Sequence, residues 1–201
     1  DLSKQIDNFE KARVFDKLPD YVKVAFNSYT QKFASSWLHA RPIKVNNLYL
    51  NDAEFRIAIL QRLGIPLFHN SPQCPNCDLK LDQYGYHALT CKRSGEKVRR
   101  HNSIRDIIFN QARNSHLNPV SEKVNLIIGS KERPADVYIP DASNEDYWID
   151  VAVTDPRQPA YFKHSLSKKN YAIDAYATKK HEKYDHHVLK WNNDQINRKA
   201  K

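Results

Sequence analysis

Four side chains that bind soft or borderline metal ions follow one another at close spacing. Two cysteines separated by two residues are followed, nine residues later, by a histidine and a third cysteine with three residues between them: Cys74, Cys77, His87 and Cys91. Thiolate and imidazole groups favour zinc over magnesium, and four protein ligands close the coordination sphere of the ion. The spacing therefore predicts one structural Zn²⁺ site, with His69 and His101 as substitutes for one of the ligands.

The cysteines have three other interpretations. Three is an odd number, which argues against a disulfide framework, so we expect no disulfide. A redox role for the CPNC sequence is disfavoured, because no βαβ pattern surrounds it. The remaining alternative to a metal site is a set of free cysteines beside a surface histidine.

Two aspartates interrupt short apolar runs in the sequence RPADVYIPDASNEDYWIDVAV, where they are Asp136 and Asp150. A carboxylate is a poor strand residue and is costly beside a core unless it is paired. On two strands joined by a turn, both carboxylates could face one sheet edge, with Glu122 of the preceding strand as a third. Such a group suits Mg²⁺, which assists phosphodiester hydrolysis. The alternative is that each aspartate is a solvated turn or strand-end residue.

The charge of the chain points to a polyanionic partner. Its 32 Lys and Arg residues exceed its 23 Asp and Glu residues, which gives a net charge of +9. A basic protein gains affinity for nucleic acid by neutralising phosphates, so DNA or RNA is the first partner to test. The sequence contains neither a long apolar run nor a signal peptide, and we expect a soluble, intracellular chain without a membrane partner. The absence of Met suggests a segment of a longer polypeptide.

The N-terminal third of the chain is predicted to be helical. One helix has apolar residues at helical spacing, which are Val22, Ala25, Phe26 and Tyr29. A second helix spans 53–63, with Asn51 as its N-cap and Gly64 as its end. We assign residues 1–68 to a helical linker segment and the turn-rich residues 69–98 to the zinc knuckle.

The remaining residues alternate between helix and strand patterns. A helix is predicted over 100–114, with one apolar face made of Ile104, Ile107, Ile108 and Ala112. Three strands (123–129, 135–140 and 147–154), a turn (141–146), an exposed helix (165–184) and a fourth strand (186–191) follow. This order predicts an α/β domain, α+β with a mixed sheet, over 99–192. The polar tail, 193–201, is expected to be disordered.

The order of several motifs resembles a known family. CPNC, YGYHALTC, RRHNSIRD, RPADVYI and DVAVTDP are similar to the restriction-like endonuclease region of certain non-LTR retrotransposon polyproteins, over roughly residues 50–185. The resemblance implies a PD-(D/E)XK core beside a CCHC zinc knuckle, and Mg²⁺-dependent nicking of target DNA to prime reverse transcription. It also implies an upstream reverse transcriptase in the same polypeptide, element RNA as a further partner, and nuclear localisation.

The resemblance assigns roles to individual residues. Asp136 matches the aspartate of the PD motif, although Ala135 separates it from the proline, and Asp150 matches the acidic residue of the next strand. Ala152 stands where the lysine of the motif is expected. In this family the lysine lies on the following helix in a K-x3-Y pattern, which Lys180 and Tyr184 fit. Other candidates for the lysine are Lys163, Lys168, Lys169, Lys179 and Lys183.

Five basic residues are candidates for contacts with nucleic acid, namely Arg99, Arg100, His101, Arg105 and Arg133. The alternative for the helix that carries most of them is a solvated basic face. Two further functions stay open for the whole chain. One is a non-catalytic, zinc-containing DNA- or RNA-binding module derived from such a nuclease, which Ala152 favours. The other is a protein-interaction domain domesticated from a mobile element.

Overall fold

The computed structural model describes residues 1–43, 49–127, 131–142 and 145–199, with side chains up to Asp185. The chain divides into two compact units. Unit 1 comprises Asp1–Ser94 and Asp155–Ile173, and unit 2 comprises Gly95–Thr154 and Asp174–Lys201. Among the described helices, none combines the length and the apolar character that a membrane crossing requires.

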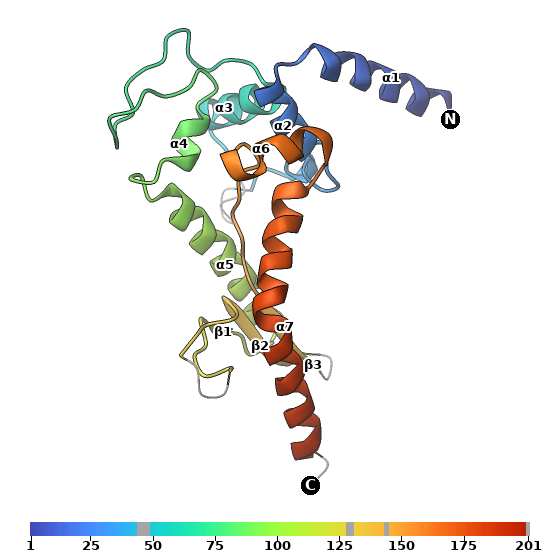
Figure 1. Cartoon of the computed structure of the whole chain (residues 1–201), viewed down its shortest axis with the longest axis vertical. Helices are drawn as coiled ribbons and strands as arrows, with labels where there is room; N and C mark the ends of the chain where they lie inside the picture. Colours follow the sequence, from blue (N-terminus) through green and yellow to red (C-terminus); the bar gives the residue numbers. More distant parts are fainter. Residues whose placement is uncertain (44–48, 128–130, 143–144, 200–201) are drawn as a thin grey trace. The chain divides into compact units, whose positions relative to one another are not determined.

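Unit 1 is built from helices and the knuckle loop. Its elements are α1 (Leu2–Lys17), α2 (Asp20–Tyr29), the 3-10 helix η1 (Ser36–His39), α3 (Asp52–Leu63), α4 (Tyr86–Thr90) and α6 (Pro159–Ser167). Helix α2 is central, because it packs against both α3 and α6 (Figure 1). Its residues Val22, Val24 and Ala25 are buried. The buried Asn27 donates hydrogen bonds to the carbonyls of Ser165 and Leu166 at the end of α6.

The predicted start and end of α3 are confirmed. Asn51 accepts a hydrogen bond from the backbone N–H of Glu54, and the Glu54 carboxylate accepts one from the backbone N–H of Asn51. Such a capping box satisfies two of the donors left open at a helix N-terminus. Gly64 ends the helix with φ +66°, in the left-handed region that glycine tolerates.

A buried cation joins the segment before α6 to α4. The guanidinium of Arg157 forms two hydrogen bonds with the carboxylate of Asp155, at 2.7 and 2.8 Å. The same group lies 3.4 Å from the ring centroid of Tyr86, the first residue of α4. Burial alone would lower the pKa of Arg157, but the hydrogen bond and the charge of Asp155 outweigh it, and the pKa is raised. Arg157 therefore stays charged and fastens α4 within unit 1.

Unit 2 contains a three-stranded antiparallel sheet and two helices, of which α5 packs against β2. Its elements are α5 (Glu96–Asn114), β1 (Val120–Ser121), β2 (Val137–Ala142), β3 (Glu145–Ile149) and α7 (Tyr171–Lys199), whose first residues belong to unit 1. The strand order is β1-β2-β3 (Figure 1). The α+β class is confirmed, but the expected mixed sheet is not observed, because every described strand pair is antiparallel.

Alternation along β2 gives the sheet two buried faces. Val137 and Ile139 pack with Ala112 of α5 in one cluster, and Ile108, Phe109, Leu117 and Ile149 lie against it. Tyr138 packs on the other side with Leu126, Ala135 and Trp148. The predicted helix 100–114 is confirmed as part of α5, but its predicted apolar face is only partly correct. Ile104 and Ile107 are 42% and 61% exposed.

The prediction of a strand at 123–129 is wrong for the residues that the structure describes, 123–127. The first strand lies earlier, at Val120–Ser121. Glu122 and Asn125 have φ values of +47° and +61°, which interrupt an extended backbone. Leu126 is buried against Tyr138 from a loop instead. The apolar segment around Leu126 therefore packs on the sheet without forming one of its strands.

Three further boundaries differ from the prediction. Strand β3 spans Glu145–Ile149 rather than 147–154, so Asp150 directly follows the strand. The single helix expected over 165–184 is two helices, α6 and α7, separated at Asn170, whose φ is +62°. The predicted strand 186–191 and tail 193–201 are helical as far as Lys199, because no glycine or proline ends α7.

Candidate metal centre and candidate active site

The knuckle of unit 1 places two cysteines on a short turn of the chain. An isolated bridge pairs Gln73 with Lys80, and the backbone N–H of Cys74 donates to the carbonyl of Leu79 at 2.9 Å. This closed loop carries Cys74 and Cys77. Helix α4 supplies the histidine, and Cys91 directly follows the helix. The carboxylate of Asp82 accepts the backbone N–H of His87 at 2.6 Å, which stabilises the start of α4.

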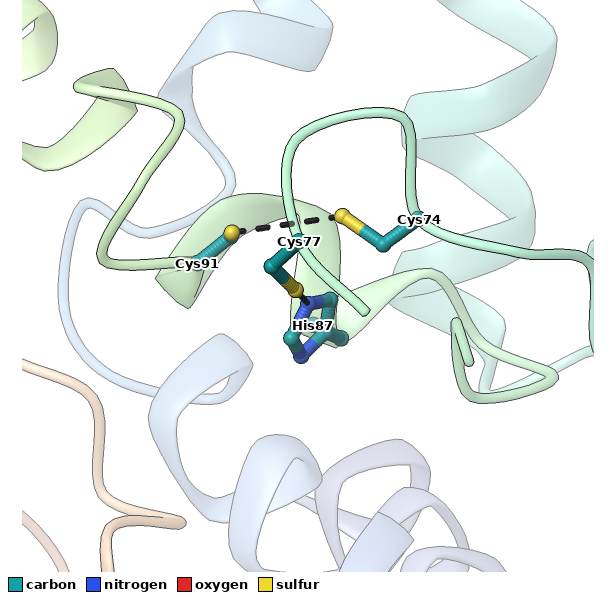
Figure 2. Close-up of side chains that lie close together, drawn as sticks. All are labelled: Cys74, Cys77, His87 and Cys91. Atoms are coloured by element: carbon teal, nitrogen blue, oxygen red, sulfur yellow. Dashed lines mark hydrogen bonds between the residues drawn. The ribbon is translucent and has the colours of Figure 1, made fainter. Parts of the chain in front are cut away.

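The ligand atoms of Cys74, Cys77, His87 and Cys91 all lie within 4.8 Å of one another (Figure 2). The two Sγ atoms of Cys74 and Cys91 are 3.9 Å apart, and Cys77 Sγ lies 3.2 Å from His87 Nε2. Zn–S bonds of about 2.3 Å in a tetrahedron place the sulfur atoms about 3.8 Å apart. The cluster can therefore hold a metal ion and is compatible with structural zinc. His69 and His101 do not belong to this group.

The environment of Cys74 favours the form that binds metal. A hydrogen bond from the backbone N–H of Asn76, opposed by burial and assisted by hydrogen bonds with Cys77 and His87, lowers the pKa of Cys74 to about 7. Thiolate, rather than thiol, is the metal ligand. All three cysteines are free of disulfide bonds.

The two aspartates of unit 2 lie at the open end of the β2–β3 hairpin, because Asp136 directly precedes β2 and Asp150 directly follows β3. The last pair of the ladder at this end is Val137 with Ile149. The backbone N–H of Asp136 donates to the carbonyl of Ile149 at 2.9 Å. The backbone N–H of Val151 donates to Asp136 Oδ2 at 2.6 Å. The backbone and the carboxylate of Asp136 therefore contact the residues on either side of Asp150.

Helix α7 places Lys180 against the second aspartate. Lys180 Nζ lies 2.8 Å from Asp150 Oδ1. The rings of Tyr176 and Tyr184, one turn before and one turn after, each have their centroid 5.7 Å from this ammonium. Burial alone would lower the pKa of Lys180, but the hydrogen bond and charge of Asp150 outweigh it, so the pKa is raised. Lys180 is therefore a cation at neutral pH.

The other candidate lysines lie elsewhere. Lys183 pairs with Glu132 at 2.9 Å, and Lys179 is exposed. Lys163, Lys168 and Lys169 belong to unit 1. Within the described part of unit 2, Lys180 is the lysine that contacts one of the two aspartates.

Glu122 has different partners from those predicted. Its two carboxylate oxygens pair with Arg105 and Arg133. Its backbone N–H donates to the carbonyl of Asp136 at 2.9 Å, so the backbones of Glu122 and Asp136 are adjacent. Among the described residues, Glu122, Asp136 and Asp150 do not form a three-ligand metal cluster, whereas the Cys/His set does. The Glu122 carboxylate therefore pairs with two arginines and does not form a metal-ligand cluster with Asp136 and Asp150.

The five predicted nucleic-acid contacts occupy varied environments. Arg133 is 56% exposed at its side chain, whereas that of Arg105 is 16% exposed between Asp106 and Glu122. Arg99 pairs with Glu96 at the start of α5, and Arg100 is half-buried. The remaining residue, His101, contacts Asp136, with Nε2 3.2 Å from Oδ2.

The sequence interpretation named His101 but not this contact, and it did not name Tyr176 or the N–H of Val151. Tyr176 could have been found from its spacing, because it precedes Lys180 by the same four residues that separate Lys180 from Tyr184. The contacts of His101 and Val151 depend on packing between distant segments and leave no local pattern. Comparison of the chain with models of protein families, with curated proteins and with solved structures finds no match.

Proposed function

We propose that the protein is a Mg²⁺-dependent endonuclease that nicks DNA, with Asp136 and Asp150 as metal ligands and Lys180 as the catalytic cation. One observation carries the proposal. Asp136 is hydrogen-bonded to the residues on either side of Asp150, and the ammonium of Lys180 lies 2.8 Å from the Asp150 carboxylate. Two acidic residues and one lysine on this framework form the set that the sequence resemblance implies.

The carboxylates retain oxygens that suit a hard cation. Oδ2 of Asp136 accepts two hydrogen bonds, and Oδ1 of Asp150 accepts one from Lys180. Within the described residues, Oδ1 of Asp136 and Oδ2 of Asp150 make no hydrogen bond. Mg²⁺ is commonly held by one or two carboxylates together with water and substrate phosphates. These two oxygens would be available to the ion, and the proposal requires no ligand from Glu122.

Each side chain then has a separate task. When bound, Mg²⁺ supplies an activated water and offsets negative charge on the phosphate. Lys180 adds a fixed positive charge, which stabilises charge that develops on the scissile phosphate. Tyr176 and Tyr184 restrict the ammonium between their rings. The exposed Arg133 and the net charge of +9 attract the DNA backbone.

The wider setting follows from the resemblance. The nick would prime reverse transcription by a polymerase in the same polypeptide, in the nucleus, with element RNA as a further partner. The Cys74, Cys77, His87 and Cys91 cluster would hold Zn²⁺ as a structural ion in unit 1.

A non-catalytic DNA- or RNA-binding module is the second candidate. It is favoured by the protein partners of the three carboxylates. Glu122 pairs with two arginines, Asp150 with Lys180, and Asp136 with His101. Carboxylates that are already paired with protein groups could have a purely structural role.

A nicking assay separates the two functions. Zinc-loaded protein is incubated with supercoiled plasmid and Mg²⁺ or Mn²⁺, beside Asp136→Asn and Asp150→Asn. The matched control is Asp7→Asn, which changes an exposed aspartate of α1. If the protein is a nuclease, wild type and control convert supercoiled plasmid to open circles, and the two site variants do not. Salt-sensitive DNA binding without nicking in any protein would favour the binding module.

A further inference from the structure

We propose that His101 is a positioning residue for Asp136, which orients the carboxylate toward the divalent cation. The inference rests on the proposed function, because it concerns the same carboxylate. It gives α5 a role in building the metal site, in place of a contact between His101 and nucleic acid.

The contacts of Asp136 carry the inference. His101 Nε2 lies 3.2 Å from Asp136 Oδ2, and the backbone N–H of Val151 donates to the same oxygen at 2.6 Å. The side chains of His101 and Asp136 are 29% and 18% exposed, so water has limited access to this contact. Two donors on Oδ2 fix the rotation of the carboxylate. Oδ1, which has no hydrogen-bond partner among the described residues, is left for the cation.

A second contact of α5 fixes the position of the histidine. Arg105 follows His101 by four residues, so both side chains lie on one face of the helix. Arg105 pairs with Glu122, and the backbone N–H of Glu122 donates to the carbonyl of Asp136 at 2.9 Å. The face of α5 thus contacts Asp136 directly through His101 and indirectly through Glu122. This double attachment explains why His101 meets the carboxylate rather than solvent.

Groups that hydrogen-bond to a metal ligand orient it, and their loss typically lowers metal affinity about 10–100-fold. His101 would act in this way without touching the metal ion. Loss of its N–H donor therefore lowers affinity for the cation while both carboxylates remain.

The test measures Mn²⁺ binding to the zinc-loaded full chain by electron paramagnetic resonance of free Mn²⁺, in the absence of DNA. Three substitutions separate the donor from the bulk of the ring. His101→Gln keeps an N–H donor at a similar reach, His101→Asn has a shorter reach, and His101→Leu has no donor. The matched control is His181→Leu, which removes another histidine–aspartate pair, with Asp185 at 2.9 Å, from an exposed part of α7.

We expect Asn and Leu at position 101 to weaken Mn²⁺ binding about tenfold or more, Gln to restore most of the affinity, and the control to match wild type. If the Leu variant fails to fold, the Mn²⁺ affinities of the Gln and Asn variants alone test the role of the N–H donor. Equal affinity in wild type, Gln and Asn variants overturns the role of His101, provided that Asp136→Asn abolishes binding. If Asp136→Asn leaves Mn²⁺ binding unchanged, the proposed metal site itself is wrong, and the role of His101 falls with it.

Discussion

Asp150 and Lys180 are thirty residues apart in the sequence, yet Lys180 Nζ lies 2.8 Å from Asp150 Oδ1. The segment after β3 has Ala152 where a lysine would complete the acidic pair locally. Helix α7 brings a lysine to the same carboxylate from another part of the chain. The position of the positive charge, rather than its place in the sequence, is what the proposed chemistry requires.

Replacing this lysine should therefore abolish nicking. In Lys180→Met we expect a loss of about 100-fold or more, the range for removal of one group that stabilises transition-state charge, with little change in DNA affinity. The control is Lys183→Met, on the same helix, whose ammonium pairs with Glu132. Nicking rates by plasmid relaxation and affinities by gel shift give the comparison. An active Lys180→Met protein, or equal losses in both variants, would contradict the assignment.

How much of the structure can be predicted from the sequence depends on how far apart in the chain the interacting residues lie. The capping box at Asn51 and the end of α3 at Gly64 are local, and both were predicted correctly. The Cys/His cluster also follows from spacing within 18 residues, Cys74 to Cys91. Six lysines were candidates for Asp150 on sequence grounds, and only the tertiary structure selects Lys180.

The errors have the same origin. The segment that contains Leu126 and Ile127 has the composition of a strand, but it is a loop. Both side chains are buried, and Leu126 packs against Tyr138. Residues 186–191 are apolar enough for a short strand, yet they continue a helix that nothing interrupts. A short apolar pattern does not distinguish these outcomes, because neighbouring segments decide them.

Removal of zinc should destabilise unit 1. Leu79 of the knuckle loop is 63% exposed and adds little apolar burial, so the free energy of metal binding would hold Cys74 and α4 together. We expect one zinc per chain by elemental analysis, and a lower unfolding midpoint by circular dichroism after chelation. Cys77→Ser should weaken zinc binding more than about 100-fold, since even the outer partners of ligands contribute 10–100-fold. His69→Ala, outside the cluster, should bind zinc normally.

Arg157→Lys should destabilise the protein although the charge is kept. Lysine cannot reproduce the two hydrogen bonds to Asp155 or the planar contact with Tyr86. Buried partners left without hydrogen bonds cost about 1–3 kcal/mol each. The exposed pair of Arg13 with Glu10 gives the control, because Arg13→Lys should change stability by less than about 0.5 kcal/mol. Similar unfolding free energies for both variants in urea would refute a structural role for Arg157.

Two glycines with nearly equal backbone angles should respond differently to alanine. Gly64 and Gly95 have φ values of +66° and +70°, and each substitution costs about 1–2 kcal/mol of backbone strain. A Cβ at Gly64 would lie 2.4 Å from Val22 Cγ1, whereas one at Gly95 meets nothing within 4 Å. We expect Gly64→Ala to cost about 1–3 kcal/mol more in urea unfolding. Val22→Ala should recover part of this difference in a double-mutant cycle.

Alkaline pH should weaken unit 2 through Tyr138. Burial, with the hydrogen bond to Asp146, raises the pKa of Tyr138 from 10.0 to about 12. A raised pKa in the folded state favours the phenol, so this stabilisation is complete below pH 10 and is lost as the pH rises through 12. Unfolding free energies between these values should fall less steeply in Tyr138→Phe. Tyr147→Phe, which removes an exposed hydroxyl from the same hairpin, should keep the wild-type slope.

The hairpin that has the two aspartates at its open end also restricts where its length can vary in evolution. Pairing is regular from Val137 to Ile139, and the register shifts between Ile139 and Ala142. A deletion of one residue before the shift would reverse the face to which Asp136 projects. Insertions beyond the shift, toward the turn, leave that pairing unchanged. The number of residues between the two aspartates can therefore change at the distal end of the hairpin while the contacts of Asp136 with Ile149 and Val151 are kept.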